Sequence, residues 1–243
     1  AVSGAVRRAM YELADQLVVY SEEEAEFGRQ ELGIKACEAA PNALYLSAES
    51  PPAPIVPRNY GLLSISRLAP NKEIRLLIEG WSLARSRLPV DAMLYVVGAG
   101  PEENFVRAVA ADPRNRVTFC GPTFDYEVLH VLYAKCDMAV SAGFVGLSAT
   151  QSAWFGRRMI YPEDAPHAPE IEVLKRLNSG VPFQAGSAID LADKIVVSLM
   201  SEPRQDSHRD LSARARAKYS MEAMAKTFIE LARVWSGNES RRK

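Results

Sequence analysis

The sequence has no excess of charge of one sign and no long apolar run, and each absence excludes a class of protein. Twenty-nine basic residues stand against thirty acidic ones, for a formal net charge of −1. The basic surface of a nucleic-acid binder is therefore missing. No apolar stretch approaches the roughly 18 residues that a membrane-spanning helix needs. We expect a soluble globular protein that binds no nucleic acid, and 243 residues are enough to bury a sizeable core.

Cysteine and histidine are also scarce. The three cysteines, Cys37, Cys120 and Cys136, are an odd number and lack a Cys-x-x-Cys spacing. We expect buried free thiols of a reducing compartment, and hence a cytoplasmic location. His130 and His208 have no carboxylate or cysteine at ligand spacing, so no metal site is predicted.

The first fifty residues predict a short strand-helix-strand unit. An amphipathic helix is expected over 4–14, a strand over 16–20, a helix that Ser21 caps and that stops near Gly33, and an extended segment over 37–46. The chain begins without Met inside a helical pattern, which indicates a piece of a longer protein. Four prolines within residues 51–57 form a stiff connector, so 51–58 is the predicted hinge.

Beyond the connector, six apolar runs alternate with six amphipathic stretches. The predicted strands are 62–66, 93–98, 116–121, 138–141, 158–161 and 181–184. The predicted helices are 71–88, 101–111, 124–134, 145–156, 169–178 and 188–201. This alternation predicts an α/β fold, a doubly wound parallel sheet of Rossmann type, over 59–203, followed by C-terminal helices over 204–243, one of them spanning 209–235. Ligands of such sheets bind where the strand order reverses, between the first and fourth strands.

A glycine turn follows the fourth strand. Gly143 and Gly146 break the apolar run before helical spacing restarts. Glycine permits a positive φ and close approach of a ligand to the main chain. The unpaired N–H groups of the next helix attract anions, phosphate above all. An ordinary strand-to-helix turn has the same pattern, so the turn alone leaves both interpretations open.

Two cations follow the first strand of the sheet, at the mouth of the same predicted crevice. Arg67 lies at the strand end and Lys72 at the start of the next helix. A lysine at a helix N-terminus opposes the helix dipole, which favours a bound anion that offsets it. Two solvated surface charges are the alternative. The segment Gly98–Pro101 is not a GxGxxG motif and is interpreted as a plain turn.

With these residues placed, the chain resembles the C-terminal part of a family 4 (group 1) glycosyltransferase, a retaining enzyme with the two-domain GT-B fold. The resemblance rests on the Arg-Leu-x-x-x-Lys spacing of 67–72, the glycine-proline turn of 97–101, the third strand over 117–121 and the helix leading into Asp137. Residues 14–21 resemble the last strand of the family's N-terminal domain, so residues 1–50 are expected to be a remnant of that acceptor domain. The segment 41–43 resembles the one before its hinge.

One feature departs from the family. Its two glutamates, eight positions apart, correspond here to Gly143 and Gln151. The second normally holds ribose hydroxyls, which Gln151 could still do. The first contacts the donor sugar, and we hypothesise that His167 or an acid at 163–164 replaces it. The alternative is that 166–170 is an ordinary helix start, with Pro169 and Glu170 in its first turn.

The resemblance implies transfer of a sugar from a nucleoside diphosphate with retention, without a cofactor and without a metal. Arg67 and Lys72 would stabilise the leaving diphosphate. The expected substrate-binding residues are Gly143, Phe144, Val145, Gly146, Leu147, Ser148, Gln151, His167 and Glu170.

The implied partners are a nucleotide-sugar donor and a saccharide or lipid-linked acceptor, in polysaccharide or glycoconjugate assembly, with at most peripheral membrane contact. The alternative is a non-catalytic Rossmann module that binds a nucleotide or a protein. A dinucleotide-dependent oxidoreductase is disfavoured, since no GxGxxG follows the first strand of the sheet.

Overall fold

The computed structural model describes residues 6, 9–11, 13–34, 36–48, 58–201 and 205–239. The chain divides into two compact units, Ala1–Ser50 with Arg216–Lys243, and Pro51–Ala215. Residues 4, 5, 7, 8 and 12 of the predicted 4–14 helix, the proline hinge apart from residue 58, and residues 240–243 lie outside the described residues, while residues 6 and 9–11 are helical. Within the described residues, no helix is long and apolar enough to cross a membrane.

The first unit contains the predicted strand-helix-strand. Strands β1 (Leu17–Val19) and β2 (Cys37–Ala39) pair in parallel, and α2 (Glu22–Gln30) connects them. The Ser21 hydroxyl caps α2 by accepting from the Glu24 N–H, as the sequence predicted.

The C-terminal helices differ from the prediction of one helix over 209–235. The structure has two, α9 (Gln205–Tyr219) and α10 (Met221–Glu239). The break has a physical cause, because the Ser220 hydroxyl accepts from the Ala223 N–H as an N-cap does. Within the first unit, α10 is joined to the residues before the connector, since the Met221 N–H donates to the Tyr45 carbonyl.

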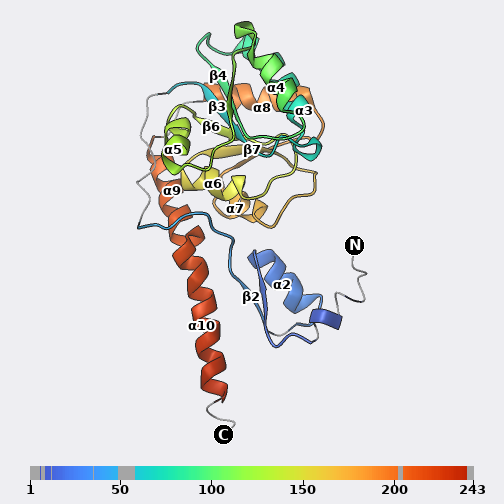
Figure 1. Cartoon of the computed structure of the whole chain (residues 1–243), viewed down its shortest axis with the longest axis vertical. Coiled ribbons are helices and arrows are strands. Elements are labelled where there is room, and N and C mark those ends of the chain that lie inside the picture. Colours follow the sequence, from blue (N-terminus) through green and yellow to red (C-terminus); the bar gives the residue numbers. More distant parts are fainter. Residues whose placement is uncertain are drawn as a thin grey trace. The chain divides into compact units, whose positions relative to one another are not determined.

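The second unit is built on a parallel sheet (Figure 1). Its strands are β3 (Gly61–Ile65), β4 (Met93–Val97), β5 (Val117–Gly121), β6 (Met138–Val140), β7 (Arg158–Pro162) and β8 (Gly180–Phe183). They lie in the order β5-β4-β3-β6-β7-β8, all parallel. Each predicted strand is confirmed to within one residue at either end. The order reverses between β3 and β6, as the sequence predicted.

Helices cover both faces of this sheet (Figure 1). One face is covered by α3 (Ile74–Ala84), α4 (Glu103–Ala110) and α8 (Ala188–Met200), whose apolar residues form the core with the strands. Trp81 is buried there, and its indole N–H donates to the Asn115 carbonyl. The other face is covered by α5 (Tyr126–Ala134), α6 (Ser148–Trp154) and α7 (Ile171–Arg176), with the rings of Tyr133 and Phe155 stacked 4.4 Å apart.

Lys72 is not at the start of α3, in contrast to the prediction. Residues Pro70–Lys72 form a 3-10 turn, and Glu73 takes a left-handed conformation with φ of 51° before α3 begins at Ile74. Pro70 fixes the start of this turn. The argument that Lys72 opposes the dipole of α3 is therefore wrong, and its neighbours decide its role.

The three cysteines are free thiols. Cys37 and Cys136 are buried as expected, but Cys120 is exposed. The reason is its strand, because β5 is an edge of the sheet and has a neighbour on one side only.

A buried arginine joins α9 to the segment that precedes β6. Arg157 is fully buried, and its guanidinium donates to the Cys136 carbonyl at 2.6 Å and approaches His208 Nδ1 at 3.3 Å. Burial first, and then the charge of Arg157, lower the pKa of His208 to about 4. His208 is therefore neutral in the folded protein at pH 6.

This pKa predicts a loss of stability in acid. Between pH 6.5 and 4 the unfolded chain binds a proton at this histidine before the folded chain does, so the free energy of unfolding falls as the pH drops through that window. Because the ring is partly exposed to solvent, we expect a loss of roughly 1–2 kcal/mol. Urea unfolding followed by tryptophan fluorescence at pH 7 and pH 4.5 measures it. The His208→Gln variant should show a smaller difference, and an unchanged difference would contradict the assignment.

Candidate functional site

The candidate site lies at the carboxyl ends of β3 and β6, where the strand order reverses. These strands pair directly, Leu62 with Met138 and Leu63 with Ala139. The segment 66–72 leaves β3, and the segment 141–147 leaves β6. The sheet thus brings the two cations and the glycine turn together at the place where the sequence predicts a crevice.

The segment after β3 is supported by the turn after β4. The Leu68 N–H donates to the Ala99 carbonyl at 2.8 Å, and the Glu102 N–H donates to the Leu68 carbonyl at 3.1 Å. Gly98 and Gly100 have φ of +143° and +154°, and a Cβ on either would collide with the backbone of residues 66–68. The Gly-x-Gly turn is therefore more than a plain turn, because only glycine allows this close packing.

Lys72 is held by the glycine turn. Its Nζ donates to the Phe144 carbonyl at 2.6 Å and lies 4.9 Å from the centre of the Phe144 ring. Burial first, and then the nearby charge of Arg67, lower the pKa of Lys72. The two cations are thus close enough to repel each other.

Arg67 differs from Lys72. Among the described residues, no hydrogen bond or ion pair involves its guanidinium, and Lys72 forms no ion pair there either. Two like charges without an ion-pair partner among the described residues favour an anion at this site, because an anion would relieve their repulsion.

Gly143 packs directly against the segment that carries Lys72. The Phe144 N–H donates to the Asn71 carbonyl at 2.9 Å. A Cβ on Gly143 would lie 2.5 Å from the Asn71 oxygen and 2.8 Å from the Lys72 carbonyl carbon. No side chain fits at Gly143 while the two loops keep this contact.

The two glycines of the turn do not have the positive φ that the sequence suggested. The glycines with positive φ in the described residues are elsewhere, at 33, 98, 100, 121, 156 and 186. Gly143 is required for close packing instead. Gly146 has space beside it, since the atom nearest to an added Cβ would be the Ala168 Cβ at 3.8 Å.

Backbone N–H groups at the start of α6 complete the crevice. Within the described residues, no backbone carbonyl accepts from the N–H of Gly146, Leu147 or Ser148. Such groups are the usual donors to anions at a helix start. Leu147, rather than Val145, is the residue that flanks the helix, which begins at Ser148.

Gln151 lies on α6 and contacts α5. The Tyr133 hydroxyl donates to its Oε1 at 3.4 Å. A contact between Gln151 and a ribose stays a prediction, and it would use the remaining capacity of the amide.

His167 joins two loops. Its Nδ1 accepts from the Val145 N–H at 3.1 Å, and its Nε2 lies 2.7 Å from the Pro162 carbonyl. Both ring nitrogens are thus engaged within the protein, a feature that sequence reasoning missed. A direct contact of His167 with a sugar stays a prediction and requires one of these bonds to break.

The remaining residues of the predicted sugar side lie in the loop after β7. Glu163 and Asp164 are exposed, whereas Glu170 is buried and immediately precedes α7. The alternative prediction places Pro169 and Glu170 in the first turn of a helix, but α7 begins only at Ile171, so both residues precede it.

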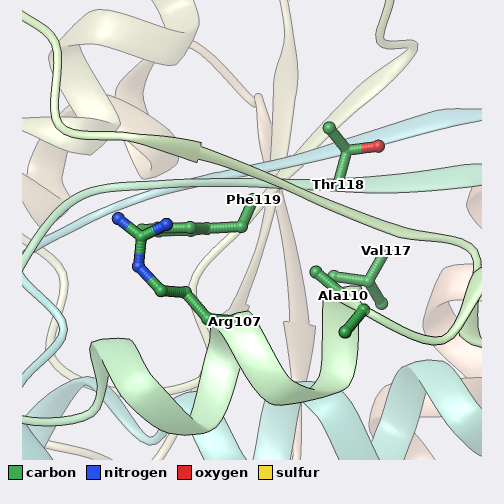
Figure 2. A pocket seen from close by; sticks show the side chains of 6 residues that line it. Arg107, Ala110, Val117, Thr118 and Phe119 are labelled. Atoms are coloured by element: carbon green, nitrogen blue, oxygen red, sulfur yellow. The ribbon is translucent and has the colours of Figure 1, made fainter.

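A shallow groove lies away from this crevice, on the edge of the sheet (Figure 2). It is lined by Arg107, Ala110, Ala111, Val117, Thr118 and Phe119. The Arg107 guanidinium lies 4.7 Å from the centre of the Phe119 ring and forms an ion pair with Glu103. The groove contains none of the predicted site residues.

Metal ligands are not clustered in the described residues, where no group of three or more His, Cys, Asp or Glu side chains could hold an ion. Independence from metal stays a prediction.

Comparison with known proteins identifies relatives of this fold. A family model described as glycosyl transferases group 1 matches residues 59–200. No curated protein sequence matches the chain. The chain resembles a TarM variant of S. aureus, in complex with Fondaparinux, alpha-GlcNAc-glycerol and UDP, with a TM-score of 0.68 and 18% identity over 93% of this chain and 46% of that one.

Two further solved structures are similar. Sucrose-phosphate synthase from Thermosynechococcus elongatus has a TM-score of 0.71 and 21% identity, over 96% of this chain and 61% of that one. HepE from Anabaena, in complex with UDP, has a TM-score of 0.71 and 16% identity, over 96% of this chain and 69% of that one. At these identities the likeness shows the fold, and the chain spans 46% of the length of TarM and 61% of the synthase.

Proposed function

The chain belongs to the group 1 glycosyltransferases, and from that premise we propose that it binds the nucleoside-diphosphate sugar donor of a retaining enzyme. Its parallel sheet has the fold of the C-terminal Rossmann-like domain of GT-B enzymes. UDP is the nucleotide to test first, because the similar TarM and HepE structures contain it. The proposed setting is polysaccharide or glycoconjugate assembly in the cytoplasm, with a saccharide or lipid-linked acceptor.

The observation that carries the proposal is the pair of cations in the crevice. Arg67 and Lys72 lie near each other at the carboxyl end of β3, without an ion-pair partner among the described residues. The N–H groups at the start of α6 follow the neighbouring strand. A diphosphate is the substrate group that uses all of these donors at once.

The chemistry follows from the charge that develops during transfer. When the bond between the anomeric carbon and the diphosphate oxygen breaks, its electron pair stays on the diphosphate. The acceptor hydroxyl oxygen forms the new bond on the same face, and its proton passes to the leaving diphosphate. Arg67, Lys72 and the α6 N–H groups stabilise the negative charge of the leaving group. Removal of one such donor typically costs roughly 100–1,000-fold in rate. No metal is needed for this step.

A non-catalytic module that binds a nucleotide is the second candidate. The observation that favours it is Gly143, where the backbone contact leaves no space for the carboxylate expected to touch the donor sugar. A protein could keep the phosphate site and still have lost the sugar contact. Nucleotide binding alone therefore does not distinguish the transferase from the non-catalytic module.

Donor binding and sugar transfer by this chain separate them. We expect the 243-residue chain to bind UDP and UDP-hexoses but not to release UDP from them, because the acceptor site belongs to residues outside it. Saturation-transfer NMR measures binding, and a coupled assay measures UDP release. A longer chain that includes the N-terminal domain should release UDP when an acceptor is present. Release by the 243-residue chain itself would contradict the assignment of roles, and binding without any release by the longer chain would favour the non-catalytic module.

A further inference from the structure

We propose that His167 is a positioning residue that sets the shape of the phosphate site by fixing the glycine turn to the loop after β7. This inference rests on the proposed function, since the site it shapes is the one assigned to the donor diphosphate. It assigns His167 a role through the backbone and not through contact with the sugar.

The geometry supporting the proposal is a bridge between two loops. His167 Nδ1 accepts from the Val145 N–H at 3.1 Å, while its Nε2–H donates to the Pro162 carbonyl at 2.7 Å. A second bond runs parallel to it, since the Ala168 N–H donates to the Val145 carbonyl at 2.9 Å. Both polar groups of Val145 are therefore held by residues 167–168.

Only the neutral form of imidazole makes both contacts. One ring nitrogen must accept while the other donates, which fixes the tautomer with the proton on Nε2. The ring is half-buried between Phe144 and Tyr161, with centroid distances of 6.4 and 6.0 Å. An Asn or Gln side chain at this position could not contact both the Val145 N–H and the Pro162 carbonyl, because its amide lacks two nitrogens on opposite sides of a rigid ring.

The bond from His167 and the bond from Lys72 meet at one peptide group, the one that joins Phe144 to Val145. Val145 follows Phe144, whose carbonyl accepts from Lys72 Nζ and whose ring lies beside the same ammonium. Val145 also precedes Gly146, the first of the N–H groups proposed to bind phosphate. A shift of Val145 therefore moves both the anchor of Lys72 and the backbone donors.

Protonation breaks the bridge on one side. A proton on Nδ1 turns the acceptor into a donor, so the Val145 N–H loses its partner. Burial first, and the charges of Lys175 on α7 and Lys72 on the 3-10 turn, lower the pKa of His167, while the bond to Pro162 raises it. Tyr161 of β7 faces the ring as a neutral group. The bridge is therefore intact at neutral pH and is lost in acid.

The test compares three variants by calorimetric titration with UDP at pH 7.5 and pH 5.5. The His167→Asn variant keeps an acceptor near the Nδ1 position and does not titrate, and His167→Gln keeps a donor near the Nε2 position. His167→Ala keeps neither. We expect about 10-fold weaker UDP binding for His167→Ala at pH 7.5 and a partial rescue by His167→Asn. Between the two pH values, the wild type should lose more affinity than His167→Asn, whose loss reports the protonation of UDP itself.

Three outcomes would overturn the proposal. The first is UDP binding by His167→Ala that equals the wild type at both pH values. The second is weaker binding of UDP-hexose alone, which would indicate direct sugar contact. The third is a larger acid loss of UDP affinity in His167→Asn than in the wild type.

A second measurement does not depend on the nucleotide. Amide hydrogen exchange at Val145 and Ala168, compared with the buried strand β6, should accelerate in His167→Ala if the bridge holds the turn. If the wild type does not bind UDP but its Val145 amide is protected from exchange, the phosphate site is overturned and the bridge is not. Unchanged exchange would overturn the bridge.

Discussion

Replacement of Gly143 by alanine should destabilise the Rossmann unit and weaken nucleotide binding more than 10-fold. The added Cβ would lie 2.5 Å from the Asn71 oxygen, so the loops after β3 and β6 must separate. Overpacking of this kind costs about 1–3 kcal/mol. Urea unfolding and UDP titration measure the two effects.

Gly146→Ala is the matched control for stability, because the atom nearest to its added Cβ is 3.8 Å away. We expect it to change the free energy of unfolding by less than about 0.5 kcal/mol. Gly143→Glu would place the family's carboxylate at its usual position, yet the same backbone collision should make it as damaging as Gly143→Ala. Improved binding by Gly143→Glu would contradict the packing described here.

The Arg67→Ala/Lys72→Ala variant should lose at least about 100-fold in UDP affinity, since each charge-assisted hydrogen bond to the diphosphate contributes roughly 1.5–3 kcal/mol. The single variant Arg67→Ala is easier to interpret than Lys72→Ala, because it removes only a charge. The Arg67 guanidinium forms no hydrogen bond or ion pair within the described part of the chain, so we expect its removal to leave the fold intact. Lys72→Ala also removes the bond to Phe144.

The control for this experiment removes the same charge elsewhere. Arg75→Ala/Arg107→Ala eliminates two cations that form ion pairs with Glu102 and Glu103, and it should bind UDP like the wild type. GDP measured beside UDP identifies the nucleotide class. Equal losses in the two double variants would show that only net charge matters and would contradict a phosphate site at Arg67 and Lys72.

The sequence was sufficient to predict the sheet and its reversal point. Strands of the second unit are short apolar runs with turns on both sides, and their alternation with amphipathic helices determines a parallel order. That order brings the segments that carry Arg67 and Gly143 together, because the connection after β5 returns to place β6 on the free side of β3. The presence of both cations and the turn at one crevice was therefore predictable.

The contacts within the crevice were not predictable, because they depend on tertiary packing. The sequence shows glycine at 143 but not whether its purpose is a positive φ or a close approach, and the close approach involves Asn71, which is distant in the chain. The same holds for the 3-10 turn that moves Lys72 off α3. The Gly-x-Gly spacing of Gly98 and Gly100 indicated close packing of the backbone, but it did not indicate that they pack against the segment after β3.

His167 illustrates a third kind of limit. The sequence analysis named it as a candidate for the missing sugar contact, yet the two bonds that define its geometry go to backbone groups of residues 145 and 162. Because nearly every residue has the same backbone groups, the sequence does not show which of them a side chain will contact. A pattern of side chains therefore found the residue but assigned it a sugar contact that the geometry does not require.

The most direct test of the account is a crystal structure of this chain with UDP. We predict the β-phosphate within hydrogen-bond distance of Arg67 and of the N–H groups at the start of α6, with Lys72 contributing its ammonium. A nucleotide seated elsewhere, for example in the groove beside Arg107 and Phe119 (Figure 2), would contradict it.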